Sequence, residues 1–73
     1  MMRDLPFECE ILDKEPVEVT NPYSGAKFIL KPDAAAVYDT IKGAELVGNS
    51  EHIRKGIDWF IKNEPDAYMK LLD

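Results

Sequence analysis

The sequence has very few of the side chains that stabilise small proteins through covalent bonds or metal ions. Cysteine occurs once, at Cys9, and histidine occurs once, at His52. A single thiol excludes an intramolecular disulfide, and one thiol with one imidazole is too few for a cysteine-based zinc site. We therefore expect no cofactor and no metal, and a fold that depends on its hydrophobic core.

Long apolar runs are also missing. No stretch approaches the roughly 18 apolar residues of a membrane-spanning helix. The opening "MMRDLPFE" has no apolar segment of the signal-peptide type. We expect a cytoplasmic protein with no membrane contact.

Positive charge is scarce. Nine Lys and Arg residues stand against 14 Asp and Glu, for a net charge of −5. Nucleic-acid affinity rests largely on cations that neutralise phosphates, so direct nucleic-acid binding is not expected. Most of the acidic excess lies in residues 1–20, and a partner with a basic surface fits this charge.

With 73 residues, the chain is long enough for one small domain, residues 1–73. A core of this size leaves little material to wall a deep cleft. The sequence therefore favours a protein that is not an enzyme.

The first half of the chain shows the period-2 alternation of half-buried strands. Phe7, Cys9 and Ile11 alternate with Glu8 and Glu10, and two later segments repeat the pattern. Short turns between such strands favour an antiparallel β-meander, with strands at about 7–11, 17–20 and 26–30.

The second half has helical periodicity and clear helix-start residues. Pro32 and Pro65 stand at first helical positions, Ser50 is a candidate N-cap, and Gly48 is a candidate terminator. The predicted fold is α+β, with the three-stranded antiparallel β-meander packed against two to three C-terminal helices, at about 32–47, 51–62 and 65–72.

The stretch "NPYSGAKF" contains a Ser-x-x-Lys spacing, Ser24 to Lys27, which some serine acyl-enzymes place on the first turn of a helix. Here it leads into a strand-like run, where positions three apart point to opposite faces. Asn21, proline and Gly25 are instead typical of a hairpin turn. The interpretation is a turn with Tyr23 exposed at its tip, where it is a further candidate for partner binding.

Two candidate partner-binding surfaces follow from these patterns. One is the outer face of the sheet, with the carboxylates of Glu8, Glu10 and Glu18. The other is an aromatic patch around Trp59 and Tyr38, which lie off the main apolar stripes of their helices. Gly43 and Gly56 inside helices indicate close helix packing, with a hinge or partner contact as the alternative.

Across "NPYSGA…LKPDAAAVYDTIKGAELVGN…KGIDWF…PDAYMKLLD" the chain resembles small uncharacterised proteins of tailed bacteriophages, especially the marine and cyanophage type. The resemblance implies a short soluble product that acts in the cytoplasm of an infected host cell. It brings no activity and no functional residues with it.

The predicted function is a small acidic protein–protein interaction module that binds a host or phage protein. One variant of this hypothesis is that the protein mimics nucleic acid and occupies a DNA-binding groove of its partner, although a net charge of −5 is small for such a role. Two alternatives stay open: a self-associating structural subunit paired through the sheet edge, and a small oligomeric enzyme with a site across subunits from His52, Ser24 or the carboxylates.

Overall fold

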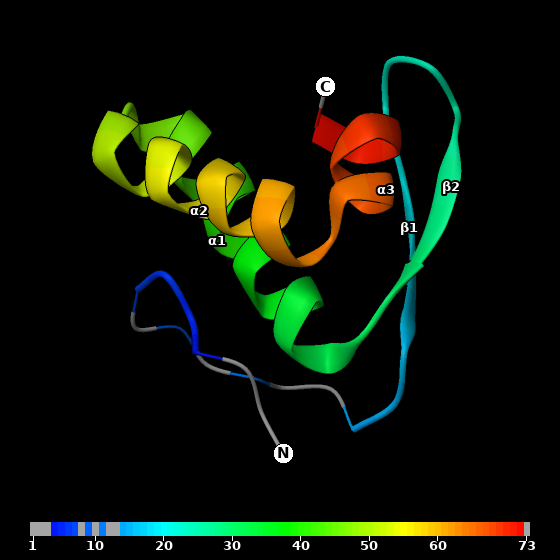
Figure 1. The fold of residues 1–73 in the computed structure, drawn as a ribbon. Helices are drawn as coiled ribbons and strands as arrows, with labels where there is room; N and C mark the ends of the chain where they lie inside the picture. The colour runs from blue at the N-terminus through cyan, green and yellow to red at the C-terminus, as the bar shows by residue number, and fades with distance from the viewer. Residues whose placement is uncertain (1–3, 8, 10, 12–13, 73) are drawn as a thin grey trace.

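The computed structural model describes residues 4–7, 9, 11 and 14–72 of the chain. Its elements are the strands β1 (Val17–Thr20) and β2 (Lys27–Leu30), the helices α1 (Pro32–Val47), α2 (Ser50–Asn63) and α3 (Pro65–Ala67), and a π-helical turn, η1 (Tyr68–Leu72). Figure 1 shows the β-hairpin standing to one side of the helices, with α1 and α2 side by side as a helical hairpin. The α+β class predicted from the sequence is confirmed.

The sheet has two strands among the described residues, so the predicted three-stranded meander is wrong. β1 and β2 pair antiparallel, with Val17 opposite Leu30 and Val19 opposite Phe28. This register places the apolar members of both strands on the face that packs against the core, as the period-2 pattern predicted.

The predicted first strand, residues 7–11, is the source of the error. Phe7, Cys9 and Ile11 belong to no strand, and Glu8 and Glu10 lie outside the described residues. Phe7 and Cys9 nevertheless pack against the core. Alternation of apolar and polar residues reports which side chains are buried, and here the burial is against α1 and α2 instead of within a sheet.

The helix boundaries follow the start and stop residues of the sequence closely. Gly48 ends α1 in the left-handed conformation at φ 73°. The cap of α2 is a correction, because Asn49 and not Ser50 accepts a hydrogen bond from the N–H of His52, at 3.2 Å. The predicted last helix is present, although after Ala67 it continues as the π-helical turn η1.

The core lies between the helical hairpin and the inner face of the sheet. Its largest fully buried side chains are Leu30, Val37, Ile41 and Phe60. Gly56 of α2 lies directly against Ile41 of α1, since a Cβ built on Gly56 would come within 2.6 Å of the Ile41 Cδ1. This confirms the close helix packing predicted for Gly56, whereas Gly43 is exposed with no such neighbour within 4 Å.

Candidate functional site

The turn between β1 and β2 is held in shape by one buried asparagine. The Asn21 N–H donates to the Ala26 carbonyl at 2.7 Å, and the Asn21 carbonyl accepts from the Gly25 N–H at 2.9 Å. Its side-chain oxygen accepts from the Tyr23 N–H at 2.8 Å. Gly25, at φ 78°, supplies the left-handed residue that closes such a turn. Asn21 therefore determines the conformation of the whole loop.

The same asparagine joins the turn to the C-terminal end of the molecule. Its Nδ2 donates to the main-chain carbonyl of Lys70 in η1, at 3.0 Å. Asn21 is only 8% exposed, so both polar atoms of its side chain are satisfied in a shielded position. The hairpin tip and η1 lie side by side in Figure 1, in agreement with this bond.

Tyr23 sits on this ordered turn with its side chain in solvent. It is 91% exposed, the largest exposed fraction among the large hydrophobic side chains of the described residues. On the outer face of the sheet, Ile29 is 63% exposed and stands opposite Glu18. Lys27 lies 4.0 Å from the Glu18 carboxylate on the same face. We call Glu18, Tyr23, Lys27 and Ile29 the hairpin surface.

The Ser24 and Lys27 side chains have separate roles in this turn. The Ser24 hydroxyl accepts from the Ala26 N–H at 3.2 Å, which is a local turn contact. The Lys27 ammonium lies on the outer face of β2, near Glu18. These contacts support the turn interpretation of "NPYSGAKF".

Of the sequence-predicted acidic face, the structure describes Glu18 alone, which is exposed on β1 as expected. Glu8 and Glu10 fall outside the described residues. The two aromatic candidates lie in the core, since Trp59 and Tyr38 are each 6% exposed. Their burial leaves no exposed aromatic patch centred on these two side chains.

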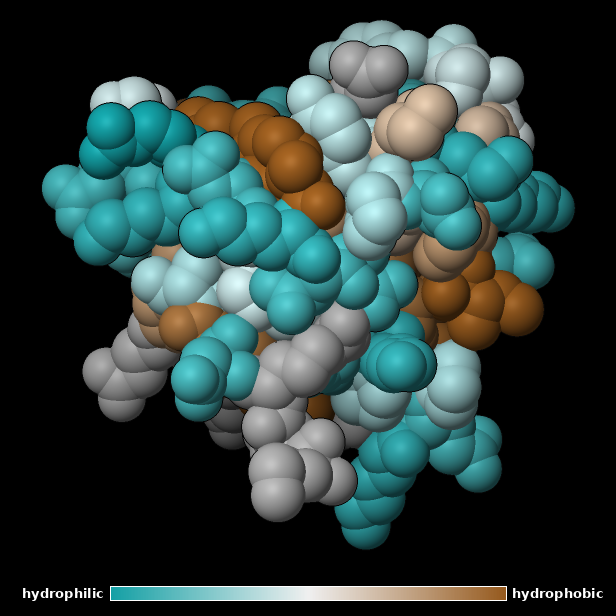
Figure 2. Space-filling model, viewed as in Figure 1, coloured by the Kyte–Doolittle hydropathy of each residue, from teal (hydrophilic) through white to brown (hydrophobic). Residues whose placement is uncertain are grey.

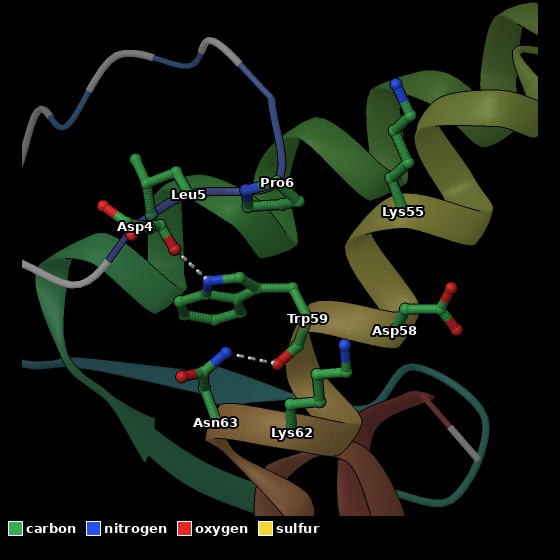
Figure 3. Close-up of a pocket in the computed structure, with 8 residues that line it drawn as sticks. All are labelled: Asp4, Leu5, Pro6, Lys55, Asp58, Trp59, Lys62 and Asn63. Carbon is green, nitrogen blue, oxygen red and sulfur yellow. Dashed lines mark hydrogen bonds between the residues drawn. The ribbon is translucent and has the colours of Figure 1, made fainter.

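Trp59 faces a shallow groove between α2 and the N-terminal segment. Its indole Nε1–H donates to the main-chain carbonyl of Asp4 at 2.6 Å, and Asn63 Nδ2 donates to the Trp59 carbonyl at 3.0 Å. The hollow beside them is about 400 Å³. Figure 3 shows its lining, which consists of Asp4, Leu5, Pro6, Lys55, Asp58, Trp59, Lys62 and Asn63.

The two side chains most suited to covalent or acid–base chemistry are placed in structural roles. The ring of Phe7 stacks on His52, with 4.9 Å between ring centroids. Burial raises the pKa of the Cys9 thiol, and a hydrogen bond with Thr40 offsets part of that rise. A thiol with a raised pKa forms little of the reactive thiolate at neutral pH.

Within the described residues, no group of three His, Cys, Asp or Glu side chains is arranged to hold a metal ion. The same part of the chain has no helix long and apolar enough to cross a membrane. The chain matches no protein-family model, and neither a curated protein nor a solved structure is significantly similar to it.

Sequence reasoning missed the two long-range contacts that organise these surfaces. Asn21 and Lys70 are 49 residues apart, and Asp4 and Trp59 are 55 apart. Both bonds end on a main-chain carbonyl, which every residue carries, so residue types alone do not reveal them. The one relevant signal in the sequence was Gly56. A glycine inside a helix indicates that another segment packs closely there, but it does not say which segment.

Proposed function

We propose that this protein is a non-enzymatic protein-interaction module that docks through the hairpin surface, with Tyr23 as its anchor. The observation that carries the proposal is an exposed aromatic ring on a turn held by a buried asparagine. Binding through a preformed turn loses less conformational entropy than binding through a mobile loop. Tyrosine is also among the residues enriched at the energetic centres of interfaces.

Exposed residues of the strands that flank the turn supply the rest of a small docking surface. Ile29 adds exposed apolar area, and Glu18 with Lys27 adds a polar border. An apolar centre with a polar rim is the usual composition of a protein interface. Figure 2 shows that most of the surface on this side of the molecule is hydrophilic, with one hydrophobic area over the strands and another along α2.

The net charge indicates the kind of partner. A chain with 14 acidic and nine basic side chains attracts a partner with a basic surface and speeds their encounter. The resemblance to small proteins of tailed phages suggests a host or phage protein as that partner, met in the host cytoplasm.

The second candidate is a self-associating subunit joined through the outer edge of β1, which pairs with no other strand in the described part of the chain. The Asn21–Ala26 hydrogen bond and the strand register together direct the backbone groups of Glu18 and Thr20 toward that edge. Pro16 and Pro22 flank these two residues and offer no N–H, so the edge provides few hydrogen bonds for a second strand. We therefore place the hairpin surface first.

Affinity capture from the producing cells, followed by titration with the purified partner, tests the proposal. Tyr23→Ala should weaken binding by at least about tenfold, since anchor side chains contribute about 2 kcal/mol or more. Leu46→Ala is the matched control, because Leu46 is 89% exposed but lies near the end of α1, away from the hairpin. Equal affinities of the wild type and Tyr23→Ala would contradict the proposal, and sedimentation at two concentrations tests self-association.

A further inference from the structure

The N-terminal residues 4–7 lie along one side of α2, with no helix or strand of their own. We infer that this side of α2 is a peptide-binding groove, and that the chain's own Asp-Leu-Pro-Phe segment occupies it as an intramolecular ligand. A partner peptide with an acidic residue followed by Leu, Pro and an aromatic residue would displace this segment. The groove residues are His52, Gly56, Trp59 and Asn63, whose spacing of four, three and four places them in one row along the helix.

The first contact recognises a peptide backbone. The Trp59 indole N–H donates to the carbonyl of Asp4 at 2.6 Å, two residues before Pro6. Such a bond depends on a main-chain atom, so any peptide of matching shape can make it. Grooves lined by aromatic residues bind extended proline-containing peptides in this general way. Figure 3 shows the segment running past the indole ring with the Asp4 carbonyl directed at Nε1.

The second contact is a binding position for an aromatic ring. Phe7 stacks on His52 at 4.9 Å between centroids and with 30° between the ring planes. Gly56 lies beside this ring, since a Cβ at that position would be in van der Waals contact with the Phe7 Cε2, at 3.4 Å. The close approach that excludes a larger residue at position 56 is to Ile41 of α1, on the other side.

The hollow carries charges of both signs on α2. Lys55, Asp58 and Lys62 line it, and Figure 3 shows Lys55 toward Pro6, across the indole ring from Asp4. Lys55 pairs with Glu51 at 2.9 Å. The acidic first position of the peptide is therefore taken from the segment itself, whose Asp4 carbonyl meets the indole, while Leu5 and Pro6 supply apolar contact.

Displacement of the segment is feasible because little regular structure depends on it. Residues 4–7 contribute no helix or strand hydrogen bonds, and Leu5, Pro6 and Phe7 are only partly buried. The hollow of about 400 Å³ between the segment and α2 is space that the segment leaves unfilled. A tethered ligand still competes strongly, since its effective concentration is in the millimolar range.

The test uses the full chain labelled with ¹⁵N and a capped peptide of sequence Asp-Leu-Pro-Phe. Trp59 is the only tryptophan, so its indole N–H signal reports on the groove without assignment of other residues. Phe7→Ala weakens the intramolecular ligand and should move this signal. Added peptide should then return it toward the wild-type position, with an apparent affinity about tenfold higher than for the wild type because less competitor is docked.

A peptide with the same four residues in the order Leu-Asp-Phe-Pro is the control and should have no saturable effect. If Phe7→Ala proves too unstable, Leu5→Ala takes its place, and the wild-type protein titrated to several millimolar peptide gives an independent reading. Absence of a saturable indole shift with the Asp-Leu-Pro-Phe peptide in a folded variant and in the wild type would overturn the inference. The segment would then be a structural cover of the core only.

Discussion

The side-chain amide of Asn21 donates to the main-chain carbonyl of Lys70 at 3.0 Å, and so ties the β-hairpin turn to the C-terminal helical turn η1. The side-chain oxygen of the same residue accepts a hydrogen bond from the Tyr23 N–H within the turn. One buried residue thus sets the shape of the loop and its position on the body of the protein. The exposure of Tyr23 on that loop is the basis of the proposed docking surface.

Asn21→Ala should destabilise the protein by about 2 kcal/mol, because it removes the acceptor of the Tyr23 N–H and the buried amide that donates to the Lys70 carbonyl. Urea denaturation followed by circular dichroism measures the change. Ser24→Ala is the matched control in the same turn and should cost well under 1 kcal/mol, since its hydroxyl makes one exposed contact. Equal losses for the two variants would contradict the role assigned to Asn21.

The two helical glycines should respond in opposite directions to alanine. Gly43→Ala should stabilise the protein by about 0.5–1 kcal/mol, since the site on α1 is open and alanine is the better helix former. Gly56→Ala should destabilise it by about 1–3 kcal/mol, since the added methyl group meets Ile41. Melting temperatures of both variants test this, and a gain in stability for Gly56→Ala would refute the tight contact between α1 and α2.

The helices were predictable from the sequence because their ends carry local signals. Pro32, Gly48 and Pro65 act within one turn of their own position, and the structure begins or ends helices where they stand. The first strand was not predictable in the same way. Phe7 and Cys9 alternate like strand residues, yet their burial depends on contacts with α1 and α2 that local patterning does not encode.

The exposed residues of the candidate site were predictable because their exposure depends on local sequence, whereas the buried ones were not. Exposure of Tyr23 and Glu18 follows from turn residues and strand alternation, which are local. The burial of Trp59 and Tyr38 depends on the packing of distant segments, and in Trp59 on a bond to the carbonyl of Asp4. Because the acceptor is a main-chain carbonyl, the residue type at position 4 does not indicate this bond.

Trp59 should behave as a core residue in mutagenesis. Trp59→Ala should cost about 3–5 kcal/mol, since the side chain is only 6% exposed. Trp59→Phe retains most of the apolar contact and loses the indole donor to Asp4, so about 1 kcal/mol is expected. Denaturant midpoints distinguish the two variants. A Trp59→Ala variant as stable as the wild type would contradict the core role of Trp59.

The free energy of unfolding should fall at alkaline pH because the Cys9 thiol loses its proton. Burial raises the pKa of its thiol in the folded state, so the unfolded chain loses the proton first as pH rises. The contribution of the protonated thiol is therefore intact below the unfolded pKa of about 8.5 and is lost as pH rises through the folded value. Urea midpoints at pH 7 and pH 9.5 should differ more for the wild type than for Cys9→Ala, and identical differences would show that Cys9 has no part in the effect.

The most direct test of the central claim, that Tyr23 is presented on an ordered turn, is the ¹⁵N relaxation of the backbone amide of Tyr23. The hydrogen bonds of Asn21 predict an order parameter of about 0.85, as in rigid backbone, with a clear decrease in Asn21→Ala. An order parameter below about 0.6 in the wild type would show a mobile loop and would contradict the proposal that Tyr23 is a preformed anchor.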